Sequence, residues 1–246
     1  MVQIKENAEA ASGLMERIRQ NKPARVGLHV SDLLSCSRRT WWFMQAGIQQ
    51  VEETDKFTLI TSLGKGFHNL LETKLEETID VEGILLTPDE ATMEDGEPVL
   101  VDFKTTRKSS SKGPEDLDTY IDQLGSYCSL LNIPRGRLHV FYLVGDIHDW
   151  NVPFKQRSSK PEHTCYDFLF SNDELYRWRE ELLRRKLMIE QAGGIEDISL
   201  DEHRSLECGI GKDHECPLIA LHACEGGGEK ERQRGAAFPR LEPFYK

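Results

Sequence analysis

The chain has 246 residues, which is enough for one large domain or two small ones. Its formal net charge of −11 argues against a protein that coats nucleic acid with its whole surface, although a local groove can still be basic. No apolar run approaches the roughly 18 residues that a membrane span needs, and the N-terminal residues lack the apolar core of a signal peptide. We therefore expect a cytoplasmic protein with no membrane contact.

The hydrophobic periodicity predicts alternating helices and strands. Helices are expected at 6–21, 57–75, 115–131 and 173–192, and an aromatic-rich helical segment is expected after Cys36. Strands are expected at about 78–86, 87–94, 97–105, 138–144, 148–154 and 164–170. This order indicates an α/β core with a mixed sheet and flanking helices.

The most informative segment is a predicted hairpin. Asp95-Gly96 is a strong signal for a two-residue turn between strands. Counting back from this turn places Asp89 directly opposite Asp102, and Lys104 shares their face because side chains alternate along a strand. Two carboxylates this close repel each other unless a cation lies between them, and Mg²⁺ favours such oxygen ligands.

Two other interpretations of this segment stay open. An ordinary hairpin could hold the acidic side chains in water. Asp80 could also supply the first carboxylate in place of Asp89, but the turn register would leave Asp80 far from Asp102. The register therefore favours Asp89.

Two flanking helices carry further candidates. His68 lies on an apolar helix ahead of the hairpin, where a lone histidine is usually a core residue. Gln123 and Tyr127 are four residues apart and share one face of the helix that follows the hairpin. They could contact a phosphate backbone with neutral donors, or Tyr127 could belong to the core with Gln123 at its rim.

Four short motifs occur in a fixed order along the chain. They are Gly64-x-x-x-His68, Pro88-Asp89, Asp102-Phe103-Lys104 and Gln123-x-x-x-Tyr127. Together they resemble the PD-(D/E)XK nuclease superfamily, and in particular its RecB-like branch. The resemblance implies a restriction-endonuclease-like core and covers roughly residues 28–130.

The resemblance also implies roles for these residues. His68, Asp89, Asp102 and the Phe103 carbonyl would bind Mg²⁺ or Mn²⁺, and Lys104 would act with the two aspartates in catalysis. A metal in such a site activates water and aligns the displacement at phosphorus. Gln123 and Tyr127 would contact DNA.

The six cysteines fall into two groups. Cys128 and Cys165 lie in a predicted helix and a predicted strand, where we expect them to be packing residues. One early and three late cysteines (Cys36, Cys208, Cys216 and Cys224) resemble the iron–sulfur staple of CRISPR-associated RecB-like exonucleases. That resemblance implies a [4Fe–4S] cluster; Zn²⁺ is the alternative and unligated thiols are a third possibility.

The sequence thus predicts a single RecB-like nuclease domain over residues 1–246. It would comprise an N-terminal helical segment (1–56), a nuclease core (57–194) and a cysteine-rich tail (195–246). The expected activity is metal-dependent hydrolysis of DNA, as an exonuclease on single-stranded or end-opened DNA in recombination, repair or CRISPR adaptation. A CRISPR integrase or a helicase would be a fitting partner. The alternatives are a catalytically silent DNA-binding or assembly subunit, and a zinc-stabilised interaction module.

Overall fold

A computed structural model describes residues 26–46, 55–71, 77–110, 117–145 and 160–198, together with positions 13, 16 and 18. The expected strand at 148–154, most of the expected helix at 6–21 and the late cysteines lie outside the described residues. Within the described part of the chain, no helix is long and apolar enough to cross a bilayer.

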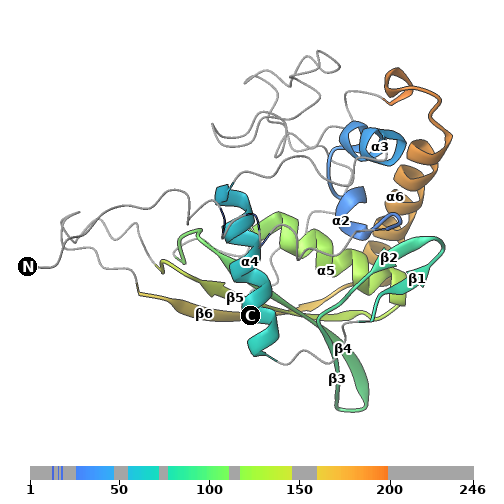
Figure 1. The fold of residues 1–246 in the computed structure, drawn as a ribbon. Coiled ribbons are helices and arrows are strands. Elements are labelled where there is room, and N and C mark those ends of the chain that lie inside the picture. Colours follow the sequence, from blue (N-terminus) through green and yellow to red (C-terminus); the bar gives the residue numbers. More distant parts are fainter. Residues whose placement is uncertain are drawn as a thin grey trace, which may run out of the picture.

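A four-stranded mixed sheet forms the centre of the fold (Figure 1). Its order is β3-β4-β5-β6, and its strands are Glu90–Glu94, Glu97–Thr106, Arg135–Tyr142 and Glu162–Leu169. The outer pairs are antiparallel, whereas β4 and β5 are parallel and are joined through helix α5, Asp118–Leu131. The expected α/β core with a mixed sheet is therefore confirmed.

The expected long strand at 78–86 is wrong. This segment forms a separate small hairpin of β1 (Ile79–Val81) and β2 (Ile84–Leu86). Glu82 and Gly83 both adopt positive φ, 56° and 73°, which closes a tight turn. The apolar alternation masked this turn because Glu-Gly is a weaker hairpin signal than Asp-Gly.

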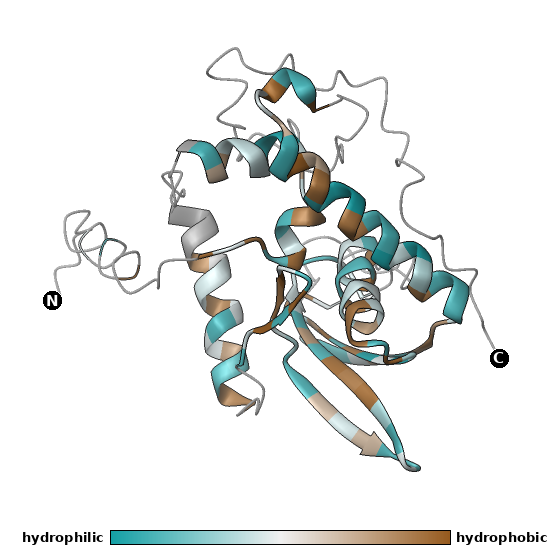
Figure 2. Cartoon of the chain, turned by 90° about the vertical axis from the view of Figure 1, so that its right-hand side faces the viewer, coloured by the Kyte–Doolittle hydropathy of each residue, from teal (hydrophilic) through white to brown (hydrophobic). Residues whose placement is uncertain are grey.

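Strand β5 shows which face of the sheet is covered. Leu138, Val140 and Tyr142 are each at most 1% exposed, while the residues between them are only half-buried. The buried face packs against α5 and α6, Asn172–Gln191, in one apolar cluster that includes Trp178. In Figure 2 hydrophilic and hydrophobic residues alternate along α6.

Helix α4, Asp55–Leu70, packs on the opposite face of the sheet. The ring of Phe67 lies 4.3 Å from that of Phe141, which points away from the α5 side. Gly64 of α4 also faces the sheet, because a Cβ at this position would be in ordinary contact with the Thr105 hydroxyl, at 3.5 Å. Helix α5 thus covers one face of the sheet, with α6 packed on α5, and α4 covers part of the other face.

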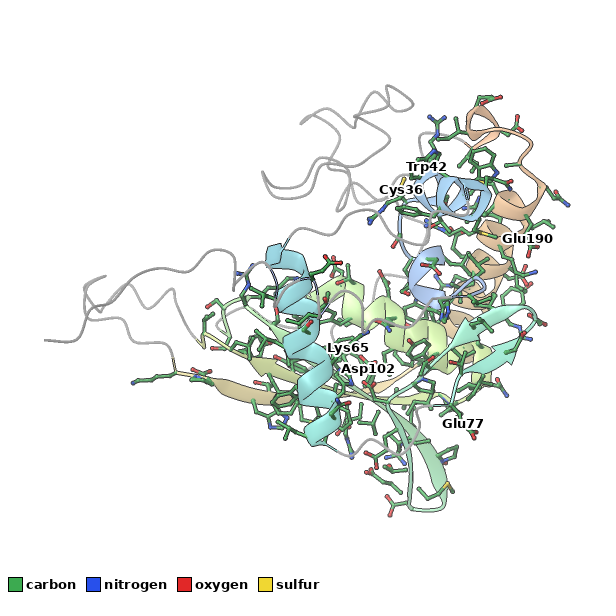
Figure 3. All side chains as sticks on the ribbon, in the orientation of Figure 1. Cys36, Trp42, Lys65, Glu77, Asp102 and Glu190 are labelled. Carbon is green, nitrogen blue, oxygen red and sulfur yellow. The ribbon has the colours of Figure 1, made fainter. Side chains whose placement is uncertain are left out.

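The short helices α2 (Val30–Leu33) and α3 (Ser37–Ala46) pack at the C-terminal end of α6. Trp41 donates from Nε1 to the Ala192 carbonyl at 3.0 Å, and Arg38 donates from Nε to the Ile198 carbonyl at 2.7 Å. Cys36 is buried where α2 passes into α3. Figure 3 shows Cys36 beside Trp42 at this corner of the molecule.

The two cysteines expected in packing positions behave differently. Cys128 is 0% exposed and lies in the core, so the prediction is confirmed there. Cys165 is exposed, so the prediction is wrong for this residue. Alternation explains the difference, because Cys165 pairs with His139 on the half-exposed face of the sheet.

Gly125 allows α5 to approach α6 closely. A Cβ at this position would lie 2.8 Å from Cη2 of the buried Trp178. We expect Gly125→Ala to lower the free energy of unfolding by about 1–3 kcal/mol because the core is overpacked. Gly66→Ala is the control: no atom lies within 4 Å of its Cβ, and alanine should stabilise α4 by about 0.5–1 kcal/mol. Equal effects of the two substitutions in urea denaturation would contradict this account.

Candidate active site

The hairpin register places the two predicted carboxylates opposite each other. Glu94 pairs with Glu97 and Glu90 with Val101, so Asp89 follows one position further, opposite Asp102. Asp95 and Gly96 form the turn with φ of 54° and 82°. The predicted register is confirmed, because the positive φ that Asp-Gly tolerates sets the pairing of every residue behind it.

Asp80 does not join this site. It pairs with Leu85 in the small β1–β2 hairpin, and its Oδ1 accepts a hydrogen bond from the Gly83 amide at 2.8 Å. Its carboxylate therefore serves a local turn on the surface.

Asp89 connects three elements at the point where β3 begins. Its Oδ2 accepts a hydrogen bond from the Phe103 amide at 2.7 Å. The carboxylate thus pairs with a backbone amide of β4 just beyond the point where the pairing of β3 with β4 ends. Its Oδ1 lies 3.0 Å from Nδ1 of His68 on α4. The structure therefore places His68 beside Asp89, a position that the resemblance to RecB-like nucleases implies.

Asp102 and Lys104 form a buried ion pair two residues apart on β4. The Nζ of Lys104 lies 2.8 Å from Oδ1 and 2.6 Å from Oδ2 of Asp102. Asp102 is 1% exposed, and its Oδ2 has no hydrogen bond of good geometry despite the short ion-pair contact. In Figure 3, Asp102 lies at the centre of the molecule near α4 and α5.

The electrostatics differ between the two carboxyl groups. Burial raises the pKa of Asp102 to about 6, against the opposing charge of Lys104 and with a further contribution from Asp89. Burial also acts to raise the pKa of Asp89, but the His68 hydrogen bond, Lys104 and the Phe103 amide together hold it below its ordinary value. Burial disfavours the charged amine of Lys104, yet Asp102 and Asp89 outweigh this and raise its pKa. Lys104 is thus a cation at neutral pH.

Gln123 and Tyr127 meet on α5, as their spacing predicts. The Nε2 of Gln123 donates to the Tyr127 hydroxyl at 2.6 Å. Tyr127 is 5% exposed, and its pKa is raised by burial and by the charge of Asp102. Gln123 is half-buried and is the more accessible of the two side chains.

The donor set suits a hard divalent cation. Two carboxylates and an imidazole converge, and an Asp102 oxygen is buried without an aligned donor. Among the described residues, however, no three His, Cys, Asp or Glu side chains are already arranged around an ion position. Each carboxylate is instead engaged by His68, by a backbone amide or by Lys104. An ion at this place would have to compete with those contacts.

The sequence analysis did not single out Tyr120, which lies on the same helix as Gln123 and Tyr127. Tyr120 lies seven residues before Tyr127, so the two share the α5 face that also carries Gln123. This periodicity was the available signal. It is weak by itself, because an aromatic stripe on a helix usually marks a core.

Comparison with known proteins gives distant structural similarity only. No family model matches the chain, and no curated protein matches it in sequence. A solved structure of a protein called SSO0001 aligns with 86% of this chain and 95% of its own, at 16% identity and a TM-score of 0.48. A phage-related exonuclease from Haemophilus somnus aligns with 68% of this chain and 97% of its own, at 13% identity and a TM-score of 0.41.

An alkaline exonuclease from Laribacter hongkongensis gives a comparable result. It aligns with 71% of this chain and 92% of its own, again at 13% identity and a TM-score of 0.41, and it has also been solved in complex with dAMP. All these TM-scores are below 0.5, and the function is therefore inferred from the geometry of this chain.

Proposed function

We propose that this protein is a metal-dependent nuclease that hydrolyses phosphodiester bonds in DNA. The observation that carries the proposal is the juxtaposition of Asp89, Asp102 and Lys104 across one hairpin, with His68 of α4 in contact with Asp89. Such a cluster is costly to stability, since Asp102 is buried and its pKa is raised. Ionisable groups whose pKa values are shifted by burial and by neighbouring charges are typical of functional sites.

Each residue has a role that its contacts support. Asp89, Asp102, the Phe103 carbonyl and His68 would hold Mg²⁺ or Mn²⁺. The metal would supply an activated water and neutralise phosphate charge. Lys104, fixed by Asp102, would place a positive charge where negative charge builds up in the transition state. Gln123 would donate its amide to the DNA backbone from the rim, supported by Tyr127.

Metal dependence provides the direct test. We expect the purified protein to degrade end-labelled single-stranded DNA with Mg²⁺ or Mn²⁺ and to stop when EDTA is added. Asp102→Asn should remove this activity because it weakens the metal site. Asp167→Asn is the matched control, since this exposed aspartate on β6 pairs with Arg137 on the other face of the sheet. Cleavage by Asp102→Asn at the wild-type rate would contradict the proposal.

The finer assignment is an exonuclease of the RecB-like type with a cysteine-held metal staple. Its support is the position of Cys36. Arg38, two residues later, hydrogen-bonds to Ile198, which is where the described part of the C-terminal region ends. Cys36 therefore lies close to the start of the segment that carries Cys208, Cys216 and Cys224. Four thiolates would suit a [4Fe–4S] cluster or Zn²⁺.

Anaerobic purification tests this staple. We expect bound iron and visible absorbance in the wild type, and loss of both in Cys36→Ser. Cys165→Ser should retain them, because Cys165 is exposed on β6. Stoichiometric zinc without visible absorbance would replace the iron–sulfur assignment, and absence of both metals would overturn the staple.

A catalytically silent DNA-binding or assembly subunit is the second candidate. The observation that favours it is the engagement of both carboxylates by protein groups, which leaves no ready arrangement of three ligands among the described residues. DNA retention without cleavage at any Mg²⁺ or Mn²⁺ concentration would establish it. A CRISPR integrase or a helicase would be a fitting partner for the active nuclease and for the silent subunit alike.

A further inference from the structure

A cavity of about 420 Å³ opens beside the candidate active site, at the C-terminal end of β4. Its walls come from α4 through Leu63, from the end of β4 through Thr105, and from α5 through Tyr120. The volume falls in the range of roughly 300–1,000 Å³ that is usual for small-molecule sites. The cavity is therefore large enough to receive one unit of a polymer or a small ligand.

The cavity and the active site are connected by shared elements. Thr105 directly follows Lys104 on β4, and Leu63 lies on the same helix as His68. Tyr120 is seven residues before Tyr127 on one face of α5, which corresponds to roughly 10 Å along the helix. A ligand in the cavity would thus lie next to the site, between the same two helices.

The lining combines positive charge with an aromatic ring. Arg107 and Lys108 follow β4 and are exposed at the cavity. The Lys108 ammonium lies 5.8 Å from the centroid of the Tyr120 ring, so a cation and an aromatic face are already adjacent. Single-strand nucleic-acid sites use this combination, with bases on aromatic rings and phosphates on cations. Because the net charge of the protein is −11, such a cationic surface would attract DNA phosphates locally while the rest of the protein repels them.

We propose that this cavity holds the nucleotide next to the scissile phosphate of single-stranded DNA. Tyr120 would stack on its base, and Arg107 and Lys108 would bind the adjoining phosphates. The inference rests on the proposed nuclease function and narrows its expected substrate, single-stranded or end-opened DNA, to a single strand with an unpaired base, because a base paired in a duplex cannot stack on Tyr120.

Binding of a short fluorescein-labelled oligothymidylate in EDTA, followed by fluorescence anisotropy, tests the cavity without cleavage. Tyr120→Leu should raise Kd about tenfold, and Tyr120→Phe should retain wild-type affinity because the ring remains. Arg107→Ala should reduce the magnitude of the negative slope of log affinity against log salt by about 0.7, the value for one lost phosphate contact on a single strand. Tyr176→Leu and Arg177→Ala, which remove the same groups from an exposed part of α6, should change neither quantity.

Two results would overturn the proposal that the cavity holds a nucleotide. Wild-type affinity in Tyr120→Leu would exclude stacking, and an equal loss in Tyr120→Phe would show that the hydroxyl, and not the ring, is responsible. Cleavage assays separate this proposal from the nuclease function. If the protein cleaves DNA and its KM is unchanged in Tyr120→Leu and Arg107→Ala, the nucleotide-binding role of the cavity is rejected and the nuclease function stands. A wild type that binds through Tyr120 but never cleaves would reject the nuclease function alone.

Discussion

Lys104→Met is expected to lower the rate of DNA cleavage by about 10²–10³-fold, the cost typical of losing one preorganised donor that stabilises transition-state charge. The amine lies 2.6 Å and 2.8 Å from the two oxygens of Asp102, and its pKa stays raised despite burial. Methionine retains the length of the side chain but not the charge. The measurement is the single-turnover rate with saturating Mg²⁺ on end-labelled single-stranded DNA.

The control for this prediction is Lys186→Met. Lys186 is also an ion-paired lysine, 3.0 Å from Glu190, but it lies on α6. Its replacement should leave cleavage unchanged. Because Lys104→Met leaves Asp102 buried without its cation, each variant should first be shown to fold by thermal unfolding. A folded Lys104→Met protein with wild-type rate would remove Lys104 from catalysis.

Arg185→Met is expected to lower the free energy of unfolding by about 3–5 kcal/mol, because it breaks a buried ion pair on one side only. Arg185 is 2% exposed, donates to Glu181 at 2.6 Å and also donates to the Leu33 carbonyl at 3.0 Å. It therefore connects α6 to the α2–α3 corner that holds Cys36. The midpoint and slope of urea denaturation measure the effect.

Arg184→Met is the matched control. Arg184 binds the same carboxylate at 2.7 Å, but its side chain is 46% exposed. Surface ion pairs contribute about 1 kcal/mol or less, so the loss should be small. Similar losses for the two arginines would show that burial does not distinguish them.

The same carboxylate gives a pH dependence with a defined sign. Burial acts to raise the pKa of Glu181, but hydrogen bonds from Arg184 and Arg185 outweigh it and hold the pKa below the ordinary value of 4.5. A pKa lowered by folding contributes stability that is present above the unfolded value. We expect this contribution to decline as pH falls below 4.5 through the folded pKa, and Glu181→Gln to remove that part of the acid sensitivity.

The hairpin and its three charged residues could be predicted because their causes are local. The Asp95-Gly96 turn fixes which residues oppose each other, and strand alternation fixes which share a face. The prediction of one strand at 78–86 was wrong because the Glu82-Gly83 turn within it has a less distinctive sequence than Asp-Gly. The prediction that Cys165 is a packing residue was wrong because strand alternation places it on a face whose exposure depends on what packs against the sheet.

The sequence by itself determined the mixed α/β class, the hairpin register and the spacing of Gln123 and Tyr127, because backbone geometry decides these over short distances. Only the tertiary structure decided that His68 meets Asp89, that Arg185 secures the corner at Cys36, and that Tyr120 and Arg107 border one cavity. These residues are far apart in the chain or on different elements. Their contacts depend on how α4, α5 and α6 pack around the sheet, which local propensity does not specify.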